Sequence, residues 1–77
     1  MLHRILVIAR EPQWARTWAD KNITAHDRMP ITCGLVDCHS YLVGVRDLAI
    51  ILVDLLPENL GDAAYKLRRN TVITVKE

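Results

Sequence analysis

The chain has 77 residues, of which 51% are apolar, and its ten Lys and Arg against nine Asp and Glu give a formal net charge of +1. This length fits one small domain over residues 1–77, and the balanced charge argues against a nucleic acid partner, since such proteins normally neutralise phosphates with a clustered basic face. No apolar run approaches the roughly 20 residues of a membrane span, and the amino terminus lacks the apolar core of a signal peptide, so the sequence predicts a cytoplasmic protein with no membrane partner.

The first quarter of the chain predicts a strand followed by a helix. Residues 3–9 form an apolar run with β-branched side chains, which is typical of a strand buried on both faces. Pro12 favours a helix start, because its missing N–H would be unpaired there, and the helix is expected over residues 12–22. Asn22 is a candidate for a left-handed residue that ends this helix.

The middle of the chain is the most ambiguous part. Polar residues 24–28 suit a loop, and residues 31–36 predict a second strand or, because Gly34 weakens a strand interior, a loop with a bulge. Over residues 40–47 we expect a short helix capped by Ser40 and ended or strained by Gly44. Its inward-facing side chains are expected to be Tyr41, Leu42 and Val45.

The last third of the chain gives the clearest pattern. Residues 48–53 are a continuous apolar strand that ends at Asp54, and Pro57 opens a further helix. Basic residues near the end of that helix are stabilised by the negative carboxyl end of its dipole. Residues 71–75 have alternating side chains that predict a closing strand. The apolar stripe of the helix comprises Leu60, Ala63, Ala64 and Leu67, and its basic residues are Lys66, Arg68 and Arg69.

This β-α-β-α-β-α-β order predicts an α/β fold, a three-layer Rossmann-like sandwich around a four-stranded, mainly parallel sheet whose last strand could be antiparallel. Ligands of such sheets bind outside the carboxyl ends of the strands, where the strand order reverses. The candidate ligand-binding side chains are therefore Arg10, Asp37 and Asp54, with Glu11, Cys38 and Leu55 beside them.

A phosphate-binding turn is not expected after the first strand. Dinucleotide and P-loop proteins place glycines there so that backbone amides can approach the ligand. Here the turn is Arg10-Glu11-Pro12-Gln13, which has no glycine and loses one amide donor at Pro12. We therefore predict no bound cofactor, although Arg10 could hold an anion.

Two segments resemble a response-regulator receiver domain. Residues 5–12, ILVIAREP, resemble the opening of that domain. Residues 50–57, IILVDLLP, resemble its phosphoacceptor strand, with Asp54 at the phosphorylated position. In that family an acidic pair after the first strand binds magnesium, and those two positions are Ala9 and Arg10 here. The resemblance thus implies a related fold without the metal site.

A second resemblance covers more of the chain and rests on residues 14–20, WARTWAD, residues 25–28, AHDR, and residues 42–47, LVGVRD. Their spacing is similar to small Rossmann-like proteins of unknown function encoded by phages of actinobacteria, of the mycobacteriophage type. The resemblance implies a phage accessory protein that acts on host machinery by binding. It supplies no catalytic residue.

Metal or nucleophile chemistry finds little support. Cys33, Cys38, His39 and His26 lack the paired two-to-four-residue spacing of structural zinc sites, so no metal is expected. The two cysteines are expected to be reduced thiols. Asp37 and Asp54 could meet at neighbouring strand ends and bind a cation, or Asp37 could cap the following helix.

Trp14 and Trp18 lie one helical turn apart, either packed on the sheet or, together with Arg16, on a partner surface. Arg16 and Asp20 could also simply pair on a solvated face. A core with only four aromatic residues gains from dimerising or docking. We therefore predict a non-enzymatic interaction protein whose partner is a host protein or a second copy. A small-molecule or nucleotide-binding module and a degenerate receiver are the alternatives.

Overall fold

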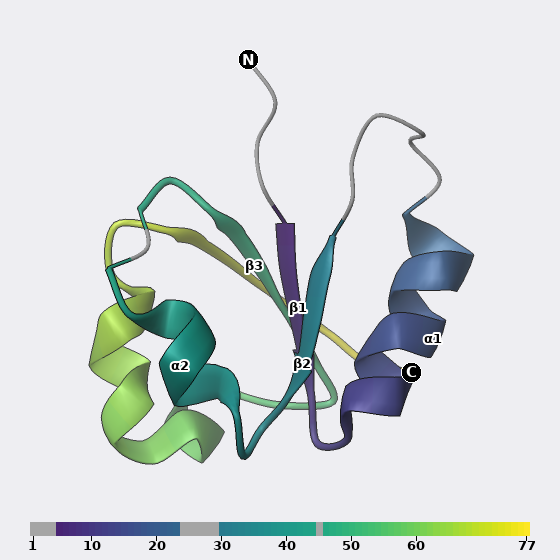
Figure 1. The fold of residues 1–77 in the computed structure, drawn as a ribbon, viewed down its shortest axis with the longest axis horizontal. Coiled ribbons are helices and arrows are strands. Elements are labelled where there is room, and N and C mark those ends of the chain that lie inside the picture. The colour runs from purple at the N-terminus through teal and green to yellow at the C-terminus, as the bar shows by residue number, and fades with distance from the viewer. Residues whose placement is uncertain (1–4, 24–29, 45) are drawn as a thin grey trace.

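Four parallel strands form the centre of the molecule (Figure 1). The computed structural model describes residues 5–23, 30–44 and 46–77. Its elements in chain order are β1 (Ile5–Ala9), α1 (Pro12–Asn22), β2 (Ile31–Gly34), α2 (Cys38–Leu42), β3 (Ala49–Val53), the 3-10 helix η1 (Pro57–Leu67) and β4 (Thr71–Val75). The strand order is β2-β1-β3-β4, and all three pairings are parallel. The predicted α/β class and parallel sheet are confirmed, and the antiparallel alternative for the last strand is wrong.

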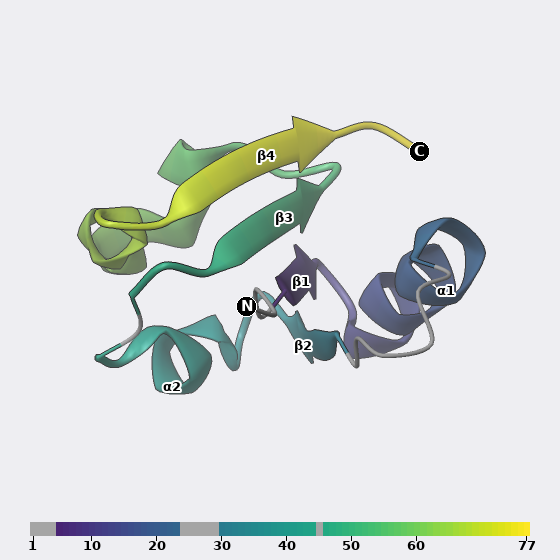
Figure 2. The same cartoon turned by 90° about the horizontal axis from the view of Figure 1, so that it is seen from above.

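The helices lie on both faces of the sheet (Figure 2). The connections β1-to-β2 and β2-to-β3 run in opposite directions across the sheet, so right-handed crossovers place their helices on opposite faces. Accordingly α1 packs on β1 and β2, whereas α2 and η1 pack together over the other face. No helix of the described residues is long and apolar enough to cross a membrane.

Alternating strand residues build a separate apolar core on each face. The core under α2 and η1 contains Leu6, Ile8, Cys33, Cys38, Leu42, Leu48, Ile50, Leu52, Leu55, Leu60, Ala63 and Leu67. The smaller core under α1 contains Val7, Ala9, Ala15, Ala19, Ile51 and Val53. Most of the apolar burial therefore lies on one side of the sheet.

The observed α1 matches the predicted residues 12–22, but its end differs. Asn22 remains helical, and its Nδ2 donates to the Trp18 carbonyl at 2.9 Å, so it is not the left-handed stop that we expected. Ile23 in extended conformation ends the helix, with its N–H on the Ala19 carbonyl. The predicted loop at 24–28 and the strand positions 3 and 4 lie outside the described residues.

The short middle helix begins earlier than predicted. β2 ends at Gly34, residues 35–37 form a turn, and α2 begins at Cys38 rather than after Ser40. Leu42 is buried as expected, but Tyr41 is 42% exposed, so its predicted inward orientation is wrong. Gly44, at φ +69°, is the second residue after the helix, which fits the predicted stop. Val45 lies outside the described residues.

The final helix differs in kind from the expected α-helix. Residues 57–67 form 3-10 turns interrupted at Gly61, whose φ of 58° and ψ of −128° are not helical. The stripe is nevertheless present, because Leu60, Ala63 and Leu67 are buried and Ala64 is partly buried. Lys66 lies in its last turn, whereas Arg68 and Arg69 lie beyond its end.

Gly34 has a packing role that its sequence position did not show. A Cβ at Gly34 would lie 2.8 Å from Pro12 Cδ and 3.2 Å from Pro12 N. Only glycine therefore lets the start of α1 approach the end of β2 so closely.

Candidate functional site

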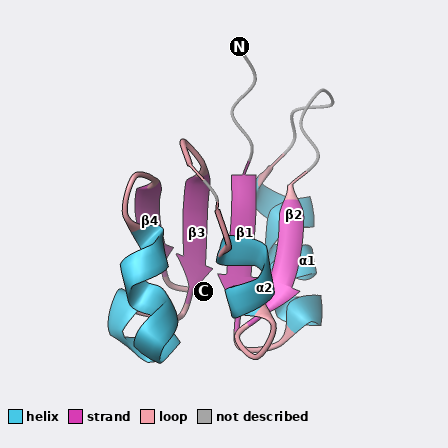
Figure 3. Ribbon diagram, turned by 60° about the vertical axis from the view of Figure 1, so that its left-hand side comes forward, coloured by secondary structure: helices cyan, strands magenta, loops and turns pink. Residues whose placement is uncertain are grey.

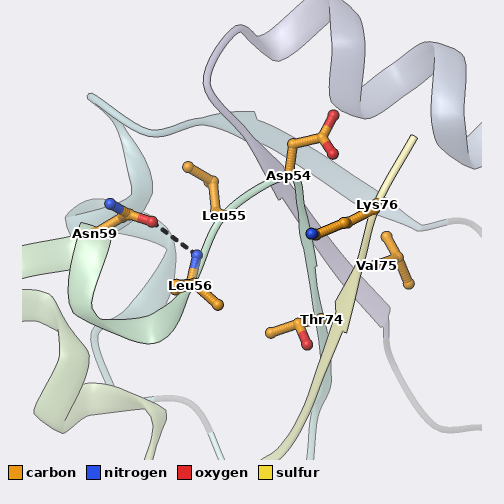
Figure 4. A pocket seen from close by; sticks show the side chains of 7 residues that line it. All are labelled: Asp54, Leu55, Leu56, Asn59, Thr74, Val75 and Lys76. Atoms are coloured by element: carbon orange, nitrogen blue, oxygen red, sulfur yellow. Dashed lines mark hydrogen bonds between the residues drawn. The ribbon is translucent and has the colours of Figure 1, made fainter.

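A hollow of about 360 Å³ lies at the carboxyl ends of β3 and β4, beside the start of η1 (Figure 4). Its described lining residues are Asp54, Leu55, Leu56, Asn59, Thr74, Val75 and Lys76. The hollow is at the edge where the sequence placed a ligand site. The expected position was between β1 and β3, where the strand order reverses, but the hollow lies between β3 and β4, one strand further along the sheet.

Asp54 forms one side of the hollow and joins the two strands. Its backbone is left-handed, with φ of 55°, and its N–H donates to the Val75 carbonyl at 2.8 Å. Its Oδ1 accepts a hydrogen bond of 2.9 Å from the backbone N–H of Glu77. Asp54 therefore continues the β3–β4 pairing beyond the strand ends, which is a structural role.

Asn59 fixes the opposite side. Its Oδ1 accepts from the Leu56 N–H at 2.8 Å, while its own N–H donates to the Leu56 carbonyl at 2.9 Å. These two bonds satisfy backbone groups at the start of η1, where Pro57 is the first residue. The wall of the hollow is thus held by the same contacts that begin the 3-10 helix.

The chemistry of the hollow suits binding. Lys76 supplies a cation, Thr74 a hydroxyl and Asp54 a carboxylate, beside the apolar side chains of Leu55 and Leu56 (Figure 4). These groups can hydrogen-bond a small ligand and neutralise an anionic group on it. Among the described lining residues there is no thiol or histidine to act as a strong nucleophile or a base near neutral pH.

The other two predicted ligand-binding residues do not line this hollow. Arg10 is exposed directly after β1. Asp37 is exposed at the amino end of α2, where it occupies the cap position without a side-chain hydrogen bond to the helix. Asp37 and Asp54 do not follow neighbouring strands as predicted, because β1 lies between β2 and β3, and only Asp54 contributes to the hollow.

No protein family, curated protein or solved structure matches this chain. The assignment of these residues therefore rests on geometry and chemistry.

Cys33 and Cys38 are free thiols buried in the larger core. Burial raises the pKa of the Cys33 thiol to about 12, and the neighbouring Cys38 and Asp37 add to the shift. Burial also raises the pKa of the Cys38 thiol, although backbone hydrogen bonds and the Lys66 charge oppose it. Because the thiolate is the reactive form, both cysteines act as small apolar core residues at neutral pH.

His39 follows Cys38 but lies on the exposed side of α2, 3.4 Å from the Lys66 ammonium through its Nδ1. This contact connects α2 to η1 rather than to the thiols. In the described parts of the chain, no three His, Cys, Asp or Glu side chains are placed to hold a metal ion. His26, the other histidine considered for zinc, lies outside those parts.

The three interaction candidates occupy different parts of the α1 surface. Trp18 is partly buried and packs against the smaller core, whereas Trp14, one turn earlier, is 53% exposed. Arg16 is exposed. Trp18 thus has a packing role, and Trp14 leaves half of its indole accessible to a partner.

Sequence reasoning missed the contribution of β4 to the site. Thr74 and Lys76 reach the hollow only because β4 pairs with β3 in parallel, which places both strand ends at one edge. The available signal was Thr71-Val72-Ile73-Thr74-Val75, five consecutive β-branched residues followed by a lysine. That pattern predicts a strand without indicating its neighbour.

Proposed function

We propose that this chain is a non-enzymatic interaction protein of the phage accessory kind, which acts by binding a host protein or a second copy of itself. The observation that supports this most is an incompletely covered apolar surface on the α1 side of the sheet. α1 packs mainly on β1 and β2 and shares one apolar cluster with Ile51 and Val53 of β3, so the least covered part of this side is the edge strand β4.

We call the side chains of Ile51, Val53, Ile73 and Val75 the open face. Their exposure rises from β3, where both residues are buried, to the edge strand β4. Ile51 and Val53 on β3 are 8% and 3% exposed, whereas Ile73 on β4 is 44% exposed. Contiguous apolar surface at a sheet margin is a common feature of interaction sites. Trp14 adds an exposed aromatic side chain on α1.

A pull-down from an actinobacterial lysate tests this proposal. The bait is wild-type protein beside Ile73→Lys, which places a charge on the open face, and Trp14→Ala, which truncates the exposed indole. We expect one host protein that wild type retains and Ile73→Lys loses, or self-association that Ile73→Lys abolishes.

Lys21→Glu on α1 is the matched control, since it alters an exposed charge away from the strands. All variants are first shown to be folded by circular dichroism. Equal retention by wild type and Ile73→Lys would remove the open face from the proposal. A wild-type protein that retains nothing and stays monomeric would contradict the interaction function as a whole.

A small-molecule-binding function is the second candidate, and the hollow beside Asp54 favours it. Added nucleotide or inorganic phosphate should then raise the melting temperature, because a ligand that binds only the folded state stabilises it by mass action. Lys76→Ala should remove that shift, whereas Arg10→Ala, outside the hollow, should retain it. No shift with any nucleotide at millimolar concentration would argue against this candidate.

We also propose that the fold is a three-layer, Rossmann-like sandwich. Its support is the order β2-β1-β3-β4, which equals the first four strands of the flavodoxin-like doubly wound order that receivers share. With Ala9 and Arg10 at the positions of the acidic pair, such a relationship gives a receiver-like scaffold that has no magnesium-dependent phosphoryl transfer.

A further inference from the structure

We propose that a second copy of this chain pairs with the outer edge of β4, antiparallel and about a two-fold axis at Ile73, so that the two sheets form one of eight strands. This inference rests on the proposed interaction function and names its partner and its surface. It assigns to β4 a role that the fold of one chain does not use.

The outer edge of β4 presents backbone groups that have no strand beside them in the described residues (Figure 3). The Thr71 N–H donates to the Leu48 carbonyl at 2.9 Å, and the Val75 carbonyl accepts from the Asp54 N–H at 2.8 Å. Residues 71 and 75 therefore direct their backbone polar groups toward β3. By the two-residue alternation of a parallel ladder, Val72 and Thr74 direct theirs outward.

The two edges of the sheet differ in how they resist pairing. β2, the opposite edge, has four residues, follows Pro30 and ends at Gly34 against the Pro12 ring. β4 has five β-branched residues with no proline, glycine or charge among them. Proteins usually protect an edge strand with short length, proline or charge, and β4 has none of these within its span.

One register suits a symmetric pair best. With Ile73 opposite Ile73 of the second copy, all five residues of each strand are paired. The outward-directed Val72 then lies opposite Thr74 of the second copy, and Thr74 opposite its Val72, so both pairs exchange hydrogen bonds. A shift of two residues in either direction leaves only three residues of each strand facing one another. Full overlap therefore fixes the two-fold axis at Ile73.

Charge supports the same register. It brings Arg69, just before β4, to the level of Glu77 of the second copy, just after its β4. Both residues are exposed and lie beyond the strand ends, Arg69 in a turn at φ 70°, so their opposite charges add a weak, solvent-screened attraction. The symmetry produces this pairing twice.

Pairing also improves the cover of the open face. Ile73 and Val75 lie on one side of β4, and the two-fold axis places Ile73 beside Ile73 of the second copy and Val75 opposite its Thr71. The half-exposed Ile73 side chains would then contact each other at the centre of the joint sheet. An isologous contact of this kind closes on itself and leaves only the two protected β2 edges outside.

Site-directed cross-linking tests the register. Ile73→Cys places two thiols at a non-hydrogen-bonded antiparallel pair, whose Cα atoms are about 4.5 Å apart, within the range of a disulfide. Mild oxidation should give a covalent dimer. Thr71→Cys is the matched control, since the two Thr71 positions are about 13 Å apart in this register. The native Cys33 and Cys38 are buried in both variants. A dimer with Thr71→Cys but not with Ile73→Cys would overturn the register.

Sedimentation velocity over a roughly hundredfold range of concentration tests the edge itself by mass action. Wild type should pass from monomer to dimer. Thr74→Pro removes an N–H that faces away from β3, so the chain should stay folded and become monomeric at all concentrations. Thr74→Val keeps the N–H and should dimerise like wild type.

The outcomes separate this inference from the proposed function. If Thr74→Pro dimerises like wild type while Ile73→Lys does not, association uses the open face without the edge, so the strand pairing is wrong and the interaction function stands. If wild type is monomeric at every concentration, the second copy is excluded as the partner. Retention of a host protein by that monomer would still support the proposed function.

Discussion

The two faces of the sheet are covered unequally, and neighbouring residues of β3 show the difference most directly. Ile50 faces α2 and η1 and is fully buried, whereas Ile51 faces the α1 side and is 8% exposed. The first face has two helices over it, while the second has only α1 among the described helices, and α1 contacts mainly β1 and β2. One face therefore stabilises the fold, and the margin of the other is available for an interaction.

The largest expected effect tests this contrast within a single strand. Ile50→Ala should lower the free energy of unfolding by about 4 kcal/mol, because it leaves a cavity under two helices. Ile51→Ala should cost only about 2 kcal/mol, since fewer side chains surround the deleted atoms. Urea denaturation of both variants measures the difference. Equal losses would mean that the α1 side is as fully packed as the other.

The contact of α1 with the sheet is tested at Gly34. Gly34→Ala should cost about 2 kcal/mol, because the added Cβ would overlap the Pro12 ring. Pro12→Ala in the same chain should recover part of that loss, since it removes the ring Cδ. A double-mutant cycle from urea denaturation gives the coupling, and strict additivity would contradict the close approach.

The amino end of the β3–β4 pair is held by Asn70, whose Oδ1 accepts from the Leu48 N–H at 2.9 Å and whose Nδ2 donates to the Arg68 carbonyl at 3.0 Å. Asn70→Ala should cost about 1.5 kcal/mol, since a part-buried N–H loses its acceptor. Asn70→Asp keeps the acceptor and should cost less. Thermal unfolding ranks the two variants, and the reverse order would show that the donated bonds matter more.

The smallest effect at neutral pH comes from the buried thiols of the well-covered face. With its pKa raised by burial to about 12, Cys33 stays protonated in the folded state at pH values where the unfolded thiol, near 9, ionises. Its contribution to stability is complete below pH 9 and is lost as the pH rises toward 12. Urea denaturation at pH 8 and pH 10.5 should therefore show a fall, which Cys33→Ala should reduce. An unchanged fall would assign it to other groups.

Local sequence patterns were enough to predict the strands, the α1 helix and the α/β class. Residues 5–9, 49–53 and 71–75 are apolar or β-branched runs whose burial is favourable wherever they pair, and Pro12 fixes the start of α1 locally. Such local features need no knowledge of distant residues. The boundary errors lie where local patterns were weak, as in α2 and at Asn22.

Which groups meet depended on how the elements pack together. The sequence marked Asp54 as a strand-end carboxylate, but its hydrogen bond to Glu77 and the hollow beside Lys76 exist because β4 lies next to β3. Likewise the sequence marked Gly34 only as a residue that weakens a strand, whereas in the structure it makes room for the Pro12 ring. Strand order depends on crossovers and packing among residues far apart in the chain, so no local pattern could place the open face or leave β4 at the edge.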